Sequence, residues 1–246
     1  MTHDNPAARL LAILERGKFK QTHIIAETVW MDLLDVDRTA PFSVAELMSK
    51  LGQFMILPYE TQKLFKQYYP AQSGNIVTCT NKIQEAFLNQ SLSGKWETFI
   101  GKIDSNTLDS LSLSSALLDN ALKTKLIEND ILEELNEKIS SLYEEVISAE
   151  LPDEFKRFMS HYLRKIKTAI DDYFISGAMP IMDALTATIG QAVIDPDYKD
   201  TLAKTEVGKK IRDTLADLAN VVTVASAAVG ATAYITTSGF PLLGVA

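Results

Sequence analysis

The sequence lacks the residue patterns from which most metal sites are built. It contains one cysteine, Cys79, in 246 residues, so no internal disulfide can form, which fits a reducing compartment. Its histidines are His3, His23 and His161, and none lies four residues from another histidine or from Cys79. This spacing excludes the usual metal-binding pair on one helix face. We therefore expect no metal site and no cofactor.

Nucleotide-binding and catalytic patterns are missing as well. Neither G-x-x-x-x-G-K nor G-x-G-x-x-G occurs, so nucleotide binding has no support in the sequence. Asp195, Asp197 and Asp200 lack the glycine and the distal glutamate of a calcium-binding EF-hand loop, so we interpret them as a turn that precedes a helix. Local spacing assembles no catalytic set, and we predict that the protein is not an enzyme. An α-helical hydrolase built from acids distant in sequence is the remaining enzymatic alternative.

The overall composition is that of a globular protein. Charged residues make up 23% and apolar residues 46%, and the formal net charge is −8, which argues against a dedicated nucleic-acid binder. The first residues carry no basic segment followed by an apolar run, so we expect no secretory signal. We expect a cytoplasmic location, with peripheral or C-terminal attachment to a membrane as the alternative.

Apolar residues recur at helical spacing throughout, and no run of alternating apolar and polar residues predicts a strand. In residues 1–72, Asn5 followed by Pro6 predicts a capped helix start, and Ser43 followed by Glu46 predicts a capping box. Pro58 is expected to begin a further helix. We predict that residues 1–72 form a region of short helices.

Residues 73–217 are predicted to form the main helical bundle. Two heptad seams lie close together in it, which predicts a central antiparallel helical hairpin. The first seam consists of Leu132, Leu135, Ile139, Leu142 and Val146. The second consists of Phe155, Met159, Tyr162, Ile166, Ala169 and Tyr173.

The second heptad helix is rich in basic residues, which are Lys156, Arg157, Arg164, Lys165 and Lys167. These side chains can meet anionic lipid headgroups or phosphates, or they can pair with acids of the preceding helix. The acids in question are Glu133, Glu134, Glu144 and Glu145. We expect the pairing, because exposed helix faces usually carry mixed charges.

The end of the chain differs from everything before it, because residues 218–246 contain no charged side chain. Residues 218–237 are long enough to cross a bilayer, but they are built mainly of alanine, valine and threonine, which makes them a marginal transmembrane candidate. Ser226 and Gly230 place small residues four apart, a spacing that lets helices approach closely in lipid or in protein. We predict a long apolar C-terminal helix over 218–246 that ends in a short stub.

The predicted fold class is thus an all-α, multi-helix bundle with the central heptad hairpin and the apolar C-terminal helix. The residues predicted to contact a membrane or partner are Val222, Ala225, Ser226, Val229, Gly230, Ala233, Tyr234, Ile235, Phe240, Leu242 and Leu243. A basic flank precedes them and consists of Lys204, Lys209, Lys210 and Arg212.

Two functional hypotheses follow from this apolar end. In the first, a non-enzymatic helical protein uses its C-terminal helix to contact or enter a membrane, as an oligomerising effector or pore-former does. In the second, a soluble helical adaptor or regulatory subunit packs that helix in its own core or against a partner subunit. An all-round apolar helix is compatible with both. The expected partners are the protein itself, another helical subunit or a membrane, and no nucleic acid.

Overall fold

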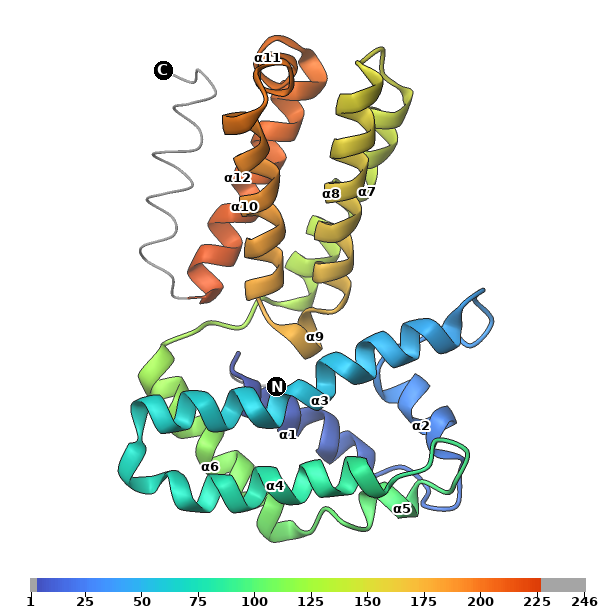
Figure 1. Ribbon diagram of the computed structural model, residues 1–246, viewed down its shortest axis with the longest axis vertical. Coiled ribbons are helices and arrows are strands. Elements are labelled where there is room, and N and C mark those ends of the chain that lie inside the picture. Colours follow the sequence, from blue (N-terminus) through green and yellow to red (C-terminus); the bar gives the residue numbers. More distant parts are fainter. Residues whose placement is uncertain (1–3, 227–246) are drawn as a thin grey trace. The chain divides into compact units, whose positions relative to one another are not determined.

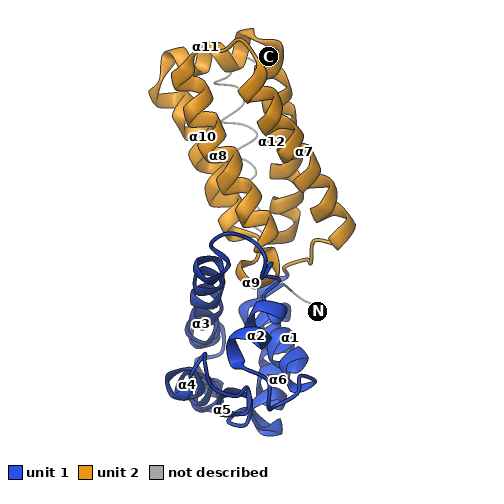
Figure 2. Cartoon of the chain, turned by 90° about the vertical axis from the view of Figure 1, so that its right-hand side faces the viewer, with its two compact units in different colours: residues 1–123 blue, residues 124–246 orange. Residues whose placement is uncertain are grey.

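The computed structural model describes residues 4–226, and these residues form two compact units (Figures 1 and 2). The units are residues 1–123 and residues 124–246. Over the described range both units are helical and contain no strand, apart from an isolated antiparallel bridge between Ile25 and Lys95. The prediction of an all-α, multi-helix fold is confirmed.

The N-terminal unit is built from helices that pack across one another. Its elements are α1 (Pro6–Lys18), α2 (Ala26–Leu33), α3 (Ser43–Tyr68), the 3₁₀ helix η1 (Pro70–Gln72), α4 (Ser73–Asn89), α5 (Glu97–Ile100) and α6 (Ser105–Leu122). Helix α4 packs against α3, and helix α6 packs against α1. Helices α4 and α6 also pack against each other. The chain therefore divides after Lys123 and not at the expected boundary after residue 72.

Aromatic rings fill the core of the N-terminal unit. Trp30 contacts Trp96 edge-on with ring centroids 4.9 Å apart, and Phe54, Phe87 and Phe99 surround this pair. Both indole N–H groups are satisfied: Trp30 donates to the Gln90 side chain and Trp96 donates to the Gly17 carbonyl. Both tryptophans are fully buried, and one aromatic cluster thus joins α2, α3, α4 and α5, with α1 attached through Gly17.

The predicted start of α1 is confirmed, whereas the prediction for α3 is wrong in two places. Asn5 accepts a hydrogen bond from the Ala8 amide, with Pro6 as the first helical residue. Ser43 makes no capping hydrogen bond, because the helix already begins at it. Glu46 instead pairs with Lys50, one turn further on. Pro58 lies inside α3 and does not begin a helix.

The C-terminal unit is a helical bundle. Its elements are α7 (Asn129–Ser148), α8 (Asp153–Asp171), α9 (Tyr173–Ser176), α10 (Met179–Ile194), α11 (Pro196–Lys204) and α12 (Glu206–Ser226). Helices α7 and α8 lie side by side, α10 packs against α8, and α12 contacts α7, α10 and α11 (Figures 1 and 2). Thr205 supplies the N-cap of α12, since its hydroxyl accepts a hydrogen bond from the Gly208 amide.

The predicted heptad positions form much of the buried faces of α7 and α8. In α7, the residues Leu135, Ile139, Leu142 and Val146 are buried, while Leu132 packs at the edge. In α8, Tyr162 is half-buried, and the neighbouring Leu163 is fully buried in its place. The buried face of α8 is wider than one seam because this helix packs against both α7 and α10.

Helix α12 crosses the expected boundary between residues 217 and 218 without a break. Ile211 and Leu215, before that position, lie in the same buried cluster as Leu218 and Val222, after it. The backbone also ties the end of this helix to the bundle, because the Lys125 amide donates to the Ala225 carbonyl over 2.9 Å. Residues 218–226 are therefore part of the C-terminal unit.

The junction of α11 and α12 depends on the absence of a side chain at Gly208. A Cβ atom at this position would lie 2.4 Å from the Leu202 carbonyl oxygen and 2.6 Å from that of Thr201. Both neighbours are backbone atoms, so they cannot rotate away as a side chain would. Gly190, in the middle of α10, has open space around its corresponding position.

We expect Gly208→Ala to lower the free energy of unfolding of the C-terminal unit by about 1–3 kcal/mol, because the added methyl group forces the two helices apart. Gly190→Ala is the matched control, and it should raise the same quantity by about 0.5–1 kcal/mol, since alanine is the better helix former. Urea denaturation of both variants measures the difference. Equal stability of the two variants would contradict the proposed close approach.

Candidate functional site

The described part of the predicted contact region lies in the protein's own core. Val222 is fully buried and Ala225 is 2% exposed, while Ser226 is half-buried. Val222 and Ala225 belong to the same apolar cluster as the seams of α7 and α8. At these positions α12 supports the bundle and presents its apolar face inward.

The other predicted contact residues lie outside the described residues. They are Val229, Gly230, Ala233, Tyr234, Ile235, Phe240, Leu242 and Leu243. Within residues 4–226, no helix combines the length and the apolarity that crossing a membrane requires.

The basic flank is partly engaged by neighbouring groups. Lys204 pairs with Asp200 one turn earlier, and Lys210 pairs with Glu145 of α7. The Arg212 guanidinium donates to the Leu202 carbonyl at the end of α11. Lys209 is exposed. The flank therefore contributes as much to helix packing inside the unit as to a surface of positive charge.

The basic residues of α8 do not form the expected pairs with the acids of α7. Lys156 donates to the Ile147 carbonyl, and Lys167 binds Asn136 and Asp171. Lys165 lies over the Tyr162 ring, with its ammonium nitrogen 5.1 Å from the centroid. The expectation is wrong, and two of the acids have other partners: Glu145 pairs with Lys210 of α12, and Glu134 pairs with Lys138 of α7.

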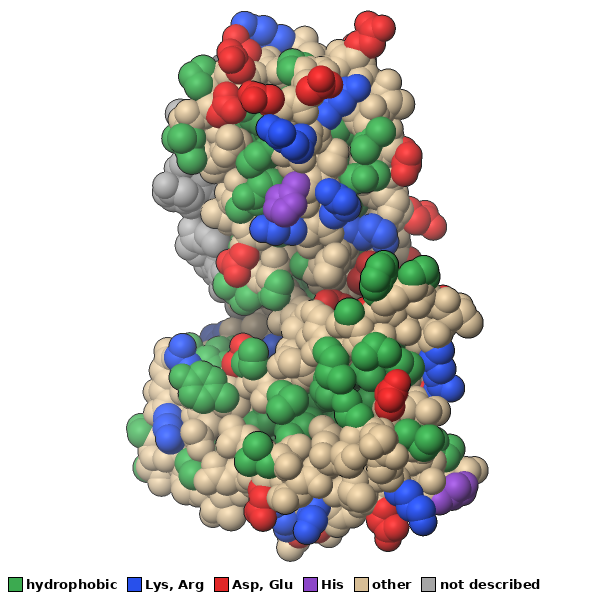
Figure 3. All heavy atoms as spheres, turned by 45° about the vertical axis from the view of Figure 1, so that its right-hand side comes forward, with side chains coloured by type: hydrophobic (Ala, Val, Ile, Leu, Met, Phe, Trp, Pro, Cys, Tyr) green, Lys and Arg blue, Asp and Glu red, His purple; other side chains and the backbone are tan. Residues whose placement is uncertain are grey.

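An exposed strip of positive charge remains on α8, which we call the α8 strip. It consists of Arg157, His161, Arg164 and Lys165, and all four side chains are exposed. Their spacing of four, three and one places them on one face of the helix. Figure 3 shows Lys and Arg side chains gathered around a histidine on the C-terminal unit, with hydrophobic side chains between them.

The N-terminal unit carries an exposed apolar stripe on α3 that the sequence analysis missed. It consists of Val44, Met48, Met55, Ile56 and Tyr59, each of which is at least 41% exposed. Hydrophobic side chains also gather on the face of this unit that Figure 3 shows. The helical spacing of these residues was the available signal, but the assumption of a break at Pro58 divided it between two helices.

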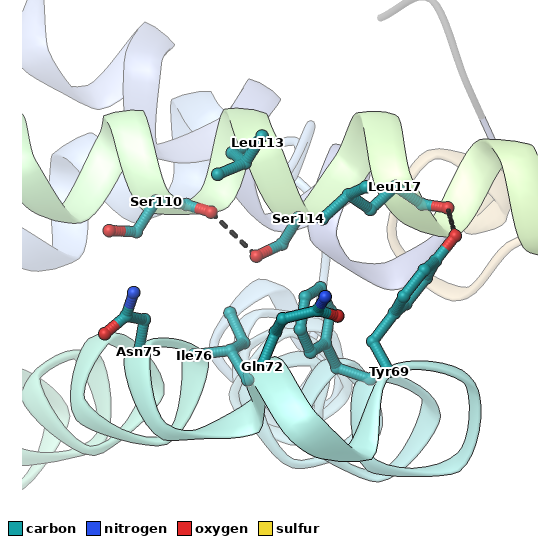
Figure 4. Close-up of a pocket in the computed structure, with 9 residues that line it drawn as sticks. Tyr69, Gln72, Asn75, Ile76, Ser110, Leu113, Ser114 and Leu117 are labelled. Atoms are coloured by element: carbon teal, nitrogen blue, oxygen red, sulfur yellow. Dashed lines mark hydrogen bonds between the residues drawn. The ribbon is translucent and has the colours of Figure 1, made fainter.

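A shallow cavity of about 280 Å³ lies between α6 and the segment from the end of α3 to the start of α4 (Figure 4). Its lining is uncharged and includes Gln72, Asn75 and Leu113. Two of its hydroxyl groups are already committed to backbone carbonyls: Tyr69 donates to Leu117, and Ser114 donates to Ser110. The volume of this cavity is at the lower limit for ligand pockets, and few polar groups in it are left to hold a small molecule in place.

The environment of Cys79 excludes it as a nucleophile at neutral pH. Burial, and then the nearby Asp104 carboxylate, raise the pKa of the thiol to about 11, so the thiol stays protonated. Its Sγ atom lies 3.4 Å from the Thr107 carbonyl oxygen. No group of three or more His, Cys, Asp or Glu side chains among the described residues is arranged to hold a metal ion. Asp195, as expected, begins a helix, and its carboxylate accepts from the amides of Asp197 and Tyr198.

Comparison with protein-family models, with curated proteins and with solved structures finds no match for this chain.

We expect Val222→Asp to destabilise the C-terminal unit by about 3–5 kcal/mol, because the substitution places an unpaired charge in the core. Val224→Asp is the matched control two residues away, where the side chain is 59% exposed. The control should change the free energy of unfolding by less than about 0.5 kcal/mol. Denaturant unfolding with a helix signal tests both. Similar stability of the two variants would show that α12 is not packed in the core.

A second expectation concerns Asp104, the N-cap of α6. Hydrogen bonds from Lys82 and from the hydroxyl and amide of Thr107 hold the pKa of this carboxyl below its ordinary value of 3.8. The ionised group therefore stabilises the folded state above pH 3.8, and this contribution is lost as the pH falls below 3.8. Asp104→Asn should lower the stability of the N-terminal unit at pH 7. The variant should also lose less stability in acid than the unchanged protein does. Asp109→Asn, an exposed position on the same helix, is the control for urea titrations at both pH values.

Proposed function

We propose that the protein is a non-enzymatic helical interaction module, an adaptor or regulatory subunit, whose C-terminal helix packs in its own core. The observation that supports this most directly is the burial of the apolar face of α12. Ile211, Leu215, Leu218 and Val222 are each at most 3% exposed in the cluster shared with α7, α8 and α10. Withdrawing this face from the bundle would expose the core that the other helices share with it.

The proposal includes a more detailed arrangement of the fold. In it, α7 and α8 form an antiparallel heptad hairpin at the centre of the bundle, and the chain continues from α12 as a long apolar helix. The burial of Leu135 and Ile139 on α7 and of Met159 and Ile166 on α8 supports the hairpin. The uncharged residues that follow Ser226 support the longer helix.

The partner in this proposal is another helical subunit or a second copy of the chain, in the cytoplasm. The exposed apolar stripe on α3 is the surface that suits such a partner. Its residues recur at the three- and four-residue spacing with which one helix packs against another. Gly52 lies between Met48 and Met55, and the space around it is open, so a second helix backbone has room to approach.

Membrane contact by the end of the chain is the second candidate function, in the form of an oligomerising effector or pore-former. The uncharged run continues through Ala246, and exposed Lys209 lies upstream of it. However, the spanning candidate at 218–237 uses residues that the structure buries, including Leu218 and Val222. Insertion of this segment would require the bundle to open.

We expect the full chain to remain in solution without detergent, and we expect neither it nor a chain ending at Ser226 to float with neutral phosphatidylcholine vesicles. The shorter chain keeps all of α12, so its melting temperature should lie within about 2 °C of the full chain's. Light scattering compares the oligomeric states of both chains. Flotation of the full chain alone would favour the membrane candidate and contradict the proposal.

A further inference from the structure

We propose that the α8 strip docks on anionic phospholipid headgroups at a bilayer surface. This inference goes beyond the proposed function and does not depend on residues after Ser226. It starts from the segregation of charge along the chain. Residues 156–170 contain five Lys and Arg side chains and no acid, in a protein with 32 acidic and 24 basic residues.

The structure brings this local excess to one surface. Arg157, Arg164 and Lys165 are exposed on the same face of α8, together with His161. The nearest acid on that helix is Glu154, which lies 4.0 Å from Arg157 with both side chains more than 80% exposed, so this pair is weak. On the border of the strip that faces α10 and α11, α10 carries Asp183 as its one charged residue, and α11 carries two acids and two lysines.

Aromatic side chains line the same border of the strip. Phe158 and Tyr162 are half-buried and stack with ring centroids 4.4 Å apart, and Phe158 also contacts the buried Tyr198 of α11. Lys165 lies over the Tyr162 ring, so its charge is held beside these aromatic side chains. Aromatic rings beside Lys and Arg are typical of surfaces that rest at the level of lipid headgroups.

A bilayer suits the strip better than a second copy of the chain does. An anionic membrane attracts each nearby Lys or Arg without a fixed partner geometry, and each one strengthens binding about fivefold. Exposed ion pairs between two copies contribute less and require matched positions. The net charge of −8 acts weakly on this contact, because charges farther than about 10 Å are screened at ordinary salt.

The test compares vesicles of phosphatidylcholine alone with vesicles that contain 30% phosphatidylserine, using the full chain. We expect binding to the anionic vesicles only. Arg164→Gln with Lys165→Gln should weaken it about 25-fold, the product of two fivefold losses. Lys63→Gln with Lys66→Gln removes the same charge from exposed positions on α3 and should have little effect. Thermal unfolding of both variants checks that each is folded.

The salt dependence of vesicle binding distinguishes this contact from insertion of the chain's apolar end. Binding through the strip should disappear near 0.5 M salt, whereas insertion through residues 218–246 should persist and should also occur with neutral vesicles. Absence of binding to phosphatidylserine vesicles, or equal binding of the two double variants, would overturn the proposal. Preferential binding to soluble polyglutamate would assign the strip to an acidic protein and would also overturn it.

Discussion

The burial of the α12 apolar face is the interaction on which the C-terminal unit depends. Helix α12 contacts α7, α10 and α11, and its buried side chains belong to the core that it shares with them. Leu218 and Val222 are fully buried there. At about 25 cal/mol per Å² of apolar surface, each such side chain contributes roughly 1.5–3 kcal/mol. Any function that removes α12 from the bundle must offset several of these contributions together.

The cores of the two units are filled by different kinds of side chain. In the N-terminal unit, large rings such as Trp30, Trp96 and Phe99 fill the space between helices of varied direction. In the C-terminal unit, most of the buried side chains are aliphatic, such as Ile139 and Ile166. This packing leaves the outer faces of the helices free to carry charge patterns, which is where the α8 strip lies.

The sequence predicts the helices and the helix starts because these depend on local spacing and local hydrogen bonds. Asn5 caps its helix as expected. Pro58 shows where prediction from local sequence fails, because proline ordinarily breaks a helix. Leu57 and Phe65 on the same helix are buried, and this tertiary packing outweighs the lost hydrogen bond. The surfaces are less predictable, because the partner of a long charged side chain such as Lys210 is fixed by helices distant in sequence.

The same long-range pairing explains why α8 retains its positive surface. The acids of α7 were its expected partners, yet Glu145 is bound by α12 and Glu134 by Lys138 of its own helix. Exposed Arg164 and Lys165 are left on a helix whose other neighbour, α10, is nearly uncharged. The packing of α12 thus closes the core and also places Lys210 beside Glu145 of α7. The charge of the α8 surface therefore depends on which residues neighbouring helices bring together, as well as on the sequence of α8 itself.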